Sequence, residues 1–276
     1  MTHFSNTLTR IPAVAASSQQ AKQKVKSSNQ ALKVSPIKNL ADATAAFQLL
    51  YKEYLVRGYC SENSTSMHYS FFCLLPTSRT FIVKSDNKVI ATISLIIDSP
   101  CGLPMECAFR NEVNSYRKHE RKVAEVGLLA LDQEFVNRMH SSNNPLKTTL
   151  LSLLWGAMKE FAIASGVTDY LNVCHPKHEK LYSNFGFNSV GPVKTYTGAE
   201  GNLGMPMWAD MSSCADTAFD ASPVNESPSN FLDSEALLWN SKLVRYLIFD
   251  RTEIVQKMTN SQLSYFKYLY PELSPG

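Results

Sequence analysis

The chain has 276 residues, of which 44% are hydrophobic and 18% are charged, as is ordinary for a soluble globular protein. That length suits one large domain, or one domain with appendages. The net charge of +3 and the pI near 8.4 are too mild to require nucleic acid as a partner, although they are compatible with an acidic one. The six cysteines lack paired short spacings, so neither a zinc site nor a disulfide framework is indicated.

The hydropathy pattern indicates neither a membrane span nor a secretion signal. No apolar run reaches the ~20 residues of a membrane-spanning helix, and residues 1–30 lack the apolar core of a signal peptide. We therefore expect a cytoplasmic protein with reduced thiols. Residues 1–31 are rich in Ser, Gln, Ala and Lys, which predicts a disordered arm; residues 7–16 are the one stretch of it compatible with a short helix.

The first ordered elements are predicted between residues 31 and 98. Residues 31–37 have a short strand pattern, and Asn39 or Asp42 is placed to cap a helix that continues to Val56 and ends at Gly58. A hairpin follows, with strands over 80–84 and 89–98 and a turn between them.

Strands and helices alternate from residue 99 to residue 211, which predicts a mixed α/β layer structure. After an irregular, Pro- and Gly-containing entry, the expected elements are a polar helix over 109–122, a buried strand over 123–132, a loop over 133–144, a helix opened by Asn144-Pro145 and ended by Gly166, a strand over 167–173, a short helix carrying Tyr182, and final strands within 187–196 and 205–211. We expect this domain to span residues 32–211.

The remaining residues predict a linker and a helical extension. Residues 212–230 are rich in Ser, Asp, Asn and Pro, as is typical of a linker. In the extension over 231–276, an apolar stripe predicts one helix over 234–249. Thr259 with Gln262 forms a capping-box pattern for a second helix that ends before Pro271.

Two side chains are candidates for acid–base chemistry. Glu125 is the one ionisable residue near the start of the apolar strand VAEVGLLALD, and a buried carboxylate requires a partner or a raised pKa. Such a group is a candidate general base. Tyr182 lies on the short helix that runs into the turn at Gly186, where a phenol can donate a proton to a leaving group. The alternative is structural: a salt-bridged Glu125 and a half-buried core tyrosine.

Several motifs resemble known acyltransferases. The element order and the ending Leu181-Tyr182-x-x-x-Gly186-Phe187 resemble the GNAT acyltransferase fold. Over residues 36–211 the chain is similar, more narrowly, to the N-acyl amino acid synthases of the FeeM type. The matching features are a GLP turn at 102–104, a polar helix, an AEV-x-x-LA strand at 124–130, the HP-x-H motif of His175, Pro176 and His178, and a first-helix signature at 51–59 shared with acyl-homoserine-lactone synthases.

This resemblance implies a GNAT-like sheet that is splayed open between its two central strands to admit a pantetheine arm. It also implies transfer of a long-chain acyl group from acyl carrier protein to the amine of an amino acid. Glu125 falls on the acidic position of the AEV strand, and Tyr182 falls on the GNAT tyrosine. The backbone around Leu129 and Leu131 falls where GNAT enzymes bind pantetheine. We expect Glu125 and Tyr182 to face each other across the gap between the strands.

The loop expected over 133–144 bears on the acyl donor. It lacks the glycines of a pyrophosphate-binding loop, which favours the single phosphodiester of a carrier protein over coenzyme A, although coenzyme A stays open. Asn144, Lys147 and Thr148 are the residues expected at the phosphate. No bound cofactor is expected, since the acyl-phosphopantetheine is a co-substrate.

Carrier proteins are acidic, so a basic surface is a candidate docking site. The basic residues of the run from 117 to 122 are either such a site or a plain exposed helix face: Arg117, Lys118, Arg121 and Lys122.

The sequence CHPKH offers Cys174, His175 and His178 as metal ligands, but three ligands crowded into five residues around Pro176 make a poor tetrahedral set. We expect no metal, and we expect His175 to orient the strand end or the substrate.

Other functions stay open at this point. Leu128 stands where the homoserine-lactone synthases have an arginine, which weakens that alternative. A coenzyme A-dependent N-acetyltransferase is a second alternative. A GNAT-like module that binds partners without catalysis is a third, from a different class.

Overall fold

The computed structural model describes residues 32–117, 121–139, 146–212, 241–248 and 254–271. They all belong to one unit, residues 31–276. The N-terminal arm, the predicted linker apart from Ser212, and the first part of the helix predicted over 234–249 lie outside the described residues. Among the described helices, none has the length and apolar character that crossing a bilayer requires.

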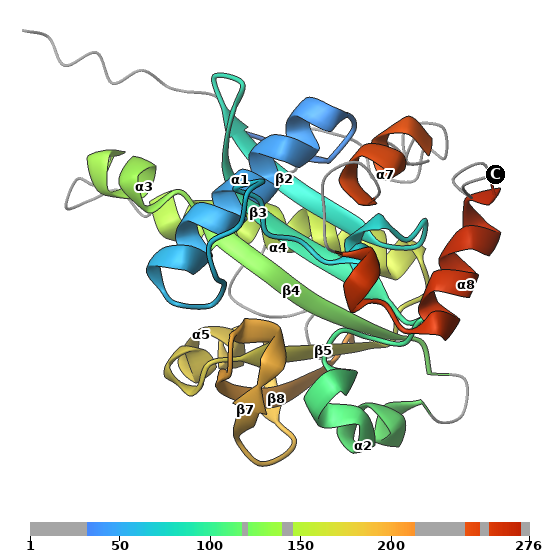
Figure 1. Cartoon of the computed structure of the whole chain (residues 1–276). Helices are drawn as coiled ribbons and strands as arrows, with labels where there is room; N and C mark the ends of the chain where they lie inside the picture. The colour runs from blue at the N-terminus through green and yellow to red at the C-terminus, as the bar shows by residue number, and fades with distance from the viewer. Residues whose placement is uncertain (1–31, 118–120, 140–145, 213–240, 249–253, 272–276) are drawn as a thin grey trace, which may run out of the picture. The chain divides into compact units, whose positions relative to one another are not determined.

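The strands form one mixed sheet (Figure 1). Their bounds are β1 Leu32–Pro36, β2 Arg79–Ser85, β3 Lys88–Ile97, β4 Val123–Leu131, β5 Asp169–Cys174, β6 Asn188–Ser189, β7 Lys194–Tyr196 and β8 Asn202–Asp210. The order is β1-β2-β3-β4-β5-β8-β6, and β7 pairs with β8 off this path. Only β4 and β5 are parallel among the described strand pairs.

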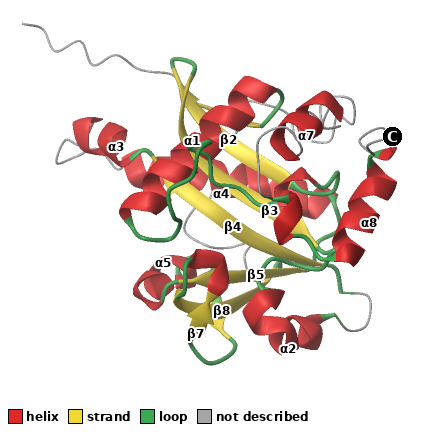
Figure 2. Cartoon of the chain, in the orientation of Figure 1, coloured by secondary structure: helices red, strands yellow, loops and turns green. Residues whose placement is uncertain are grey.

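Helices cover both faces of the sheet (Figure 2). Their bounds are α1 Leu40–Val56, α2 Glu106–Tyr116, α3 Gln133–Met139, α4 Leu146–Ala164, α5 Glu179–Ser183, α7 Ser241–Ile248 and α8 Asn260–Leu269. The core on one face contains α4 and α5 residues. The core on the other contains residues of α1, α2, α7 and α8. The C-terminal helices therefore share a hydrophobic core with the sheet.

Two predicted helix caps and one predicted helix stop are confirmed, whereas the helix start predicted at Asn144-Pro145 lies outside the described residues. The Asn39 side chain accepts a hydrogen bond from the backbone N–H of Asp42 and caps α1, and Gly58 adopts the left-handed φ of +69° that follows the helix. The Thr259–Gln262 capping box is formed at α8.

Two predicted segments differ from the structure. The loop expected over 133–144 contains α3, because the Asp132 side chain accepts a hydrogen bond of 3.0 Å from the backbone N–H of Phe135 and so caps a helix. The helix expected over 109–122 is α2, which begins earlier, has non-helical backbone angles at Phe109 and ends at Tyr116. Arg121 and Lys122 lie in the irregular chain that leads into β4.

Candidate active site

The two central strands are paired over only a short distance. The parallel register joins Val123 to Asp169, Ala124 to Tyr170 and Glu125 to Leu171, and no registered pair follows. Both strands continue beyond this point, to Leu131 and Cys174. Figure 1 shows β4 and β5 diverging from this end. The splayed sheet expected from the resemblance is therefore present, with Glu125 at the last paired position.

A bulge in β4 accompanies the divergence. Leu128 has a left-handed φ of +51°, which is rare for a residue with a branched side chain. At the same place the register between β3 and β4 slips between Thr92 and Ser94. An extra residue in one strand bends it and increases its twist. The bulge therefore turns the second half of β4 relative to β5.

Asn172 of β5 bridges the two strands just past the last pair. Its Nδ2 donates a hydrogen bond of 2.7 Å to the backbone carbonyl of Val126. The side chain is almost fully buried, at 1% exposure. Its Oδ1 has no hydrogen-bond partner among the described residues. A buried acceptor without a partner costs free energy. A donor that entered the gap and bonded to this oxygen would recover that cost.

Glu125 is held by the loop that precedes α2. Its carboxylate accepts a hydrogen bond of 2.8 Å from the backbone N–H of Met105, and the residue is 5% exposed. Burial raises the pKa of Glu125 to about 8, the Met105 N–H acts in the opposite direction, and the nearby Glu106 raises it further. A carboxyl group with a pKa near neutrality is suited to general-base catalysis.

Tyr182 is buried at the other side of the gap. It lies in α5, which ends in the turn where Gly186 adopts a φ of +87°. Burial raises the pKa of Tyr182, the neighbouring Cys174 raises it further, and the polar side chain of Asn172 acts in the opposite direction. The phenol is therefore protonated at neutral pH, the state that a general acid requires.

The expectation that Glu125 and Tyr182 face each other directly is wrong. Ala124 and Val126, which flank Glu125, belong to the core on the α4 side, so Glu125 points to the α1 and α2 side. Tyr182 belongs to the α4 side. The two residues therefore reach the diverging strands from opposite faces of the sheet, and a chain threaded between the strands would have one on each side.

Two further buried tyrosines, Tyr54 and Tyr196, lie near the candidate acid and base. Tyr196 of β7 has its pKa raised by burial and by nearby Glu125 and Tyr54. Burial raises the pKa of Tyr54 of α1, and Tyr182 and Tyr59 add to it. The phenols of Tyr54 and Tyr196 thus connect the surroundings of Glu125 with those of Tyr182. The motif YKEYLVRGY pointed to the helix that carries Tyr54, but nothing in the pattern singled out Tyr196.

The residues expected to bind pantetheine occupy different settings. Leu129 and Leu131 lie on the diverging part of β4 and pack against the α4-side core. Lys147 and Thr148 are exposed in the first turn of α4. Asn144 lies outside the described residues. The backbone of β4 around Leu129 and Leu131 therefore borders the gap. Binding of the phosphate at the N-terminus of α4 stays a prediction.

His175 ends β5 and begins the short 3-10 turn Pro176–His178. Its Nδ1 accepts a hydrogen bond of 3.2 Å from the backbone N–H of Lys177. Its ring centroid lies 6.3 Å from that of Tyr59. Its expected part in orienting the strand end or the substrate stays a prediction. Among the described residues, no three His, Cys, Asp or Glu side chains are grouped to hold a metal ion.

The residues expected to dock a carrier protein have partners within the chain. Arg117 pairs with Asp98 and Glu106. Arg121 pairs with Asp169 and Asp210, and Lys122 Nζ donates to the backbone carbonyl of Ser165 at 2.7 Å. Lys118 lies outside the described residues. The expected basic helix face is therefore wrong for Arg121 and Lys122, and docking by the group stays a prediction.

A mixed sheet that splays beside a buried acid and a buried phenol is the arrangement that the resemblance to GNAT-like acyltransferases implies. The sequence model of the N-acyl amino acid synthase FeeM matches residues 45–210. The chain belongs to this family. A comparison with curated proteins finds no match.

The chain is similar to several solved structures, of which the first two below have TM-scores above 0.5. The chain is similar to FeeM, an N-acyl amino acid synthase from uncultured soil microbes, with a TM-score of 0.59 and 21% identity over 69% of this chain and 96% of that one. It is also similar to the AHL synthase LasI, with a TM-score of 0.52 and 12% identity over 72% of this chain and 100% of that one. A putative N-acetyltransferase from Lactobacillus plantarum aligns at a TM-score of 0.42 and 13% identity, over 66% of this chain and 99% of that one.

Proposed function

We propose that the protein transfers a long-chain fatty acyl group from acyl carrier protein to the amine of an amino acid. One observation carries the proposal: the pairing of β4 with β5 ends at a buried glutamate whose pKa is near neutrality. Membership of the FeeM family supports acyl transfer to the amine of an amino acid.

The unpaired edge of β4 is the proposed binding site of the pantetheine arm. Beyond Glu125 this edge has no registered partner in β5, so backbone groups around Leu129 and Leu131 are available to the amides of the arm. An extended chain that adds to a strand edge gains the hydrogen bonds that a strand would make. The same N–H groups are suited to polarise the thioester carbonyl.

The chemistry then uses the two groups on either side of the gap. Glu125, as the carboxylate, removes a proton from the α-ammonium of the acceptor. The free amine attacks the thioester carbonyl, the carbon–nitrogen bond forms and the carbon–sulfur bond breaks. Tyr182 donates its proton to the departing pantetheine thiolate, and the second proton that the attacking nitrogen loses as the amide forms returns to the tyrosinate, directly or through water. In this scheme His175, at the end of β5, orients the acceptor.

The absence of glycine between Gln133 and Pro145 supports a carrier protein as the donor. The described part of this segment is the helix α3, and the N–H groups of Gln133 and Phe135 at its start already donate to the carboxylates of Glu53 and Asp132, so they are not offered to a pyrophosphate. The exposed Lys147 and Thr148 in the first turn of α4 are sufficient for one phosphodiester. We retain the Arg117 to Lys122 segment as the proposed docking region, with part of its charge balanced internally.

The experiment is a single-turnover assay with purified protein. Acyl carrier protein loaded with hexadecanoyl chains is mixed with all twenty amino acids, and the products are identified by mass spectrometry. An N-acylated amino acid that disappears in the Glu125→Gln variant is the expected result. Equal turnover of hexadecanoyl-coenzyme A would contradict the donor assignment. Full activity of Glu125→Gln would contradict the assignment of the base.

A further inference from the structure

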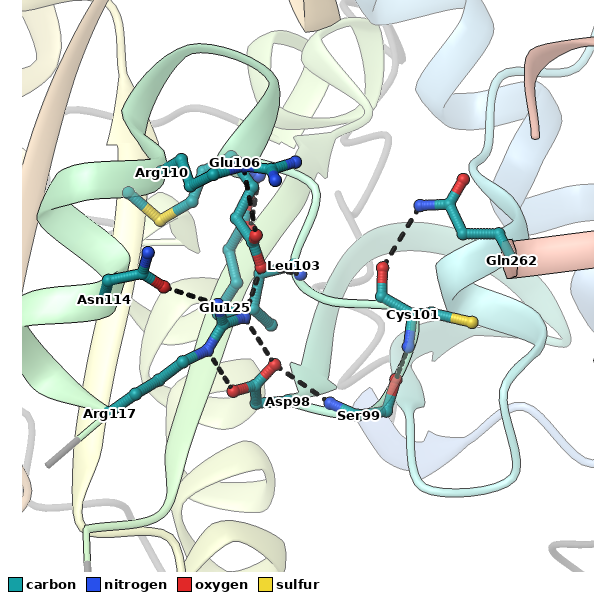
Figure 3. Close-up of polar contacts among 11 residues, drawn as sticks. Asp98, Ser99, Cys101, Leu103, Glu106, Arg110, Asn114, Arg117, Glu125 and Gln262 are labelled. Carbon is teal, nitrogen blue, oxygen red and sulfur yellow. Dashed lines mark hydrogen bonds and ion pairs between the residues drawn. The ribbon is translucent and has the colours of Figure 1, made fainter. Parts of the chain in front are cut away.

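The loop that carries the hydrogen bond to Glu125 is fixed by contacts on both of its sides. This loop, residues 98–105, connects β3 to α2 and ends at Met105, whose N–H contacts the carboxylate. Figure 3 shows Asp98, Ser99, Cys101 and Leu103 of the loop together with Glu125. The position of that N–H therefore depends on what holds the loop. Two side chains, from α8 and from the end of α2, do so.

On one side, the guanidinium of Arg117 binds both ends of the loop. Its Nε and Nη2 donate to the Asp98 carboxylate at 2.7 and 2.8 Å, and Nη2 also contacts Glu106. Glu106 in turn accepts a hydrogen bond of 2.8 Å from the backbone N–H of Leu103. Gly102 turns the loop at a φ of +77°, and a Cβ there would lie 2.5 Å from the Glu106 carboxylate. The loop is therefore closely fitted on this side.

On the other side, the loop is held by a helix from the far end of the chain. Gln262 of α8 donates from Nε2 to the backbone carbonyl of Cys101 at 3.1 Å, as Figure 3 shows. Its Oε1 accepts the capping-box hydrogen bond from the Thr259 N–H at 2.9 Å. The helix is anchored by Phe266, which is 1% exposed, and Tyr270 at its C-terminal end donates to the carbonyl of Leu74 at 2.8 Å. This helix lies outside residues 45–210, which the family model matches.

We infer that Gln262 is a positioning residue for the acyl transfer: through its bond to Cys101, helix α8 holds loop 98–105 so that the Met105 N–H stays on the Glu125 carboxylate. The inference rests on the proposed function, because it concerns the base of that reaction. It assigns a part in catalysis to a segment that the family match does not include.

The consequence is a change in the ionisation of Glu125 when α8 releases the loop. Among the described residues, the charged and titratable groups that act on Glu125 or respond to it include Glu106 of α2, Cys73 of the 3-10 helix Phe71–Leu74, and Tyr196 of β7, none of which is a cation. The cation Arg117, which contacts Glu106, is paired with Asp98 and Glu106. The Met105 N–H is therefore the contact that favours the carboxylate. If that N–H withdraws, the neutral acid is favoured, and the base becomes active only at higher pH.

The test compares two substitutions at the same capping box. Gln262→Ala removes the bond to Cys101 together with one half of the box. Thr259→Ala removes the other half of the box and leaves the Gln262 donor in place, so it controls for the stability of α8. The pH dependence of kcat/KM is measured with hexadecanoyl acyl carrier protein and the preferred amino acid. Amide hydrogen exchange of residues 98–105 is measured on the same proteins.

The expected result is that Gln262→Ala moves the acidic limb of the pH profile upward by about half a unit. That shift lowers kcat/KM at pH 7 about threefold, since one unit corresponds to a factor of ten. Faster amide exchange in the loop accompanies it, and Thr259→Ala changes neither. Gln262→Met, which keeps the aliphatic length, repeats the test if the alanine variant does not fold.

The inference would be overturned if Gln262→Ala changed neither the acidic limb of the pH profile nor the amide exchange of residues 98–105. It would also be overturned if Thr259→Ala shifted the acidic limb by the same amount as Gln262→Ala. Glu125→Gln is assayed in parallel. If Glu125→Gln is inactive while Gln262→Ala behaves like the parent protein, the inference alone fails. If Glu125→Gln stays active, Glu125 is not the base and the proposed function fails at that point. In that case amide exchange still tests the bond between Gln262 and Cys101, and an exchange rate of residues 98–105 that Gln262→Ala leaves unchanged would refute the role of that bond in holding the loop.

Discussion

The side chain of Asn172 is bonded to the backbone of Val126 across the point where β4 and β5 separate, with Nδ2 2.7 Å from the carbonyl oxygen. The last registered pair, Glu125 with Leu171, immediately precedes this contact. The Asn172 side chain here replaces the backbone hydrogen bonds that would otherwise pair β4 with β5. The gap therefore has a defined beginning, and the carboxylate of Glu125 lies next to it.

Replacing Asn172 by alanine is expected to lower both stability and activity. The Val126 carbonyl would lose its donor, and an unmade buried hydrogen bond costs about 1–3 kcal/mol. The Tyr182 hydroxyl would lose the neighbouring amide that partly offsets the effect of burial on its pKa. Urea unfolding measures the first effect, and kcat measures the second. Asn188→Ala, at an exposed position of β6, is the control and should change stability by less than about 0.5 kcal/mol.

Tyr182→Phe is expected to reduce kcat about a hundredfold, because proton transfer by a positioned side chain contributes on that order or more. The phenyl ring keeps the packing against Phe187, whose ring centroid lies 5.8 Å away, so the fold should be retained. Single-turnover kinetics of acyl transfer measure the effect.

Tyr54→Phe is the matched comparison for this prediction, because the Tyr54 phenol is also buried and lies near Tyr182. A smaller loss in Tyr54→Phe than in Tyr182→Phe supports Tyr182 as the acid. The reverse order would move the acid to α1.

Glu125→Gln is expected to change the pH dependence of stability. The Glu125 pKa is raised in the folded protein to about 8 from an ordinary value near 4.5, so its stabilising effect is fully present below pH 4.5 and is lost as pH rises through 8. Over that window the loss approaches about 1.4 kcal/mol per pH unit. A neutral glutamine does not titrate. The variant should therefore gain stability relative to the parent protein as pH rises from 5 to 8.5.

Denaturant unfolding of both proteins across this range measures that difference. A difference in unfolding free energy that is constant with pH would show that Glu125 has an ordinary pKa in the folded protein. The assignment of a near-neutral base would then be lost even if the variant were inactive.

Features that depend on neighbouring residues could be predicted from the sequence. The Asn39 cap of α1 and the capping box at Thr259 involve residues three apart, and the apolar period of residues 123–132 identified a buried strand. The helix α3 has an equally local signal, since the Asp132 side chain at the end of the strand accepts a hydrogen bond from the Phe135 N–H and so caps the helix; the loop prediction for residues 133–144 is wrong at this point. The position of Glu125 in the sheet followed from the resemblance, since no local pattern reveals where two strands part.

Features that depend on distant residues could not be predicted. The partner of Glu125 is a backbone N–H 20 residues away, and Gln262 contacts a carbonyl 161 residues away. No local sequence pattern indicates either of these two contacts. The opposite orientation of Glu125 and Tyr182 is also a consequence of the three-dimensional arrangement, because it depends on which face α5 covers. Asn172 could have been identified from the sequence, because it is an amide side chain in an otherwise largely apolar strand.

Arg121 provides the last test, which separates a structural role from a docking role. Its Nε lies 2.5 Å from Asp169 Oδ2, and the Asp169 side chain is fully buried at the start of β5. Removing the partner of a buried charge costs about 3–5 kcal/mol, and the partial exposure of Arg121 reduces this to about 2–3 kcal/mol. Arg121→Ala should therefore lower the unfolding free energy by that amount, as measured in urea. Asp169→Asn should restore much of it in the double variant, because the unpaired charge is then absent. If Arg121→Ala left stability unchanged and raised only the KM for acyl carrier protein, the residue would belong to a docking surface instead.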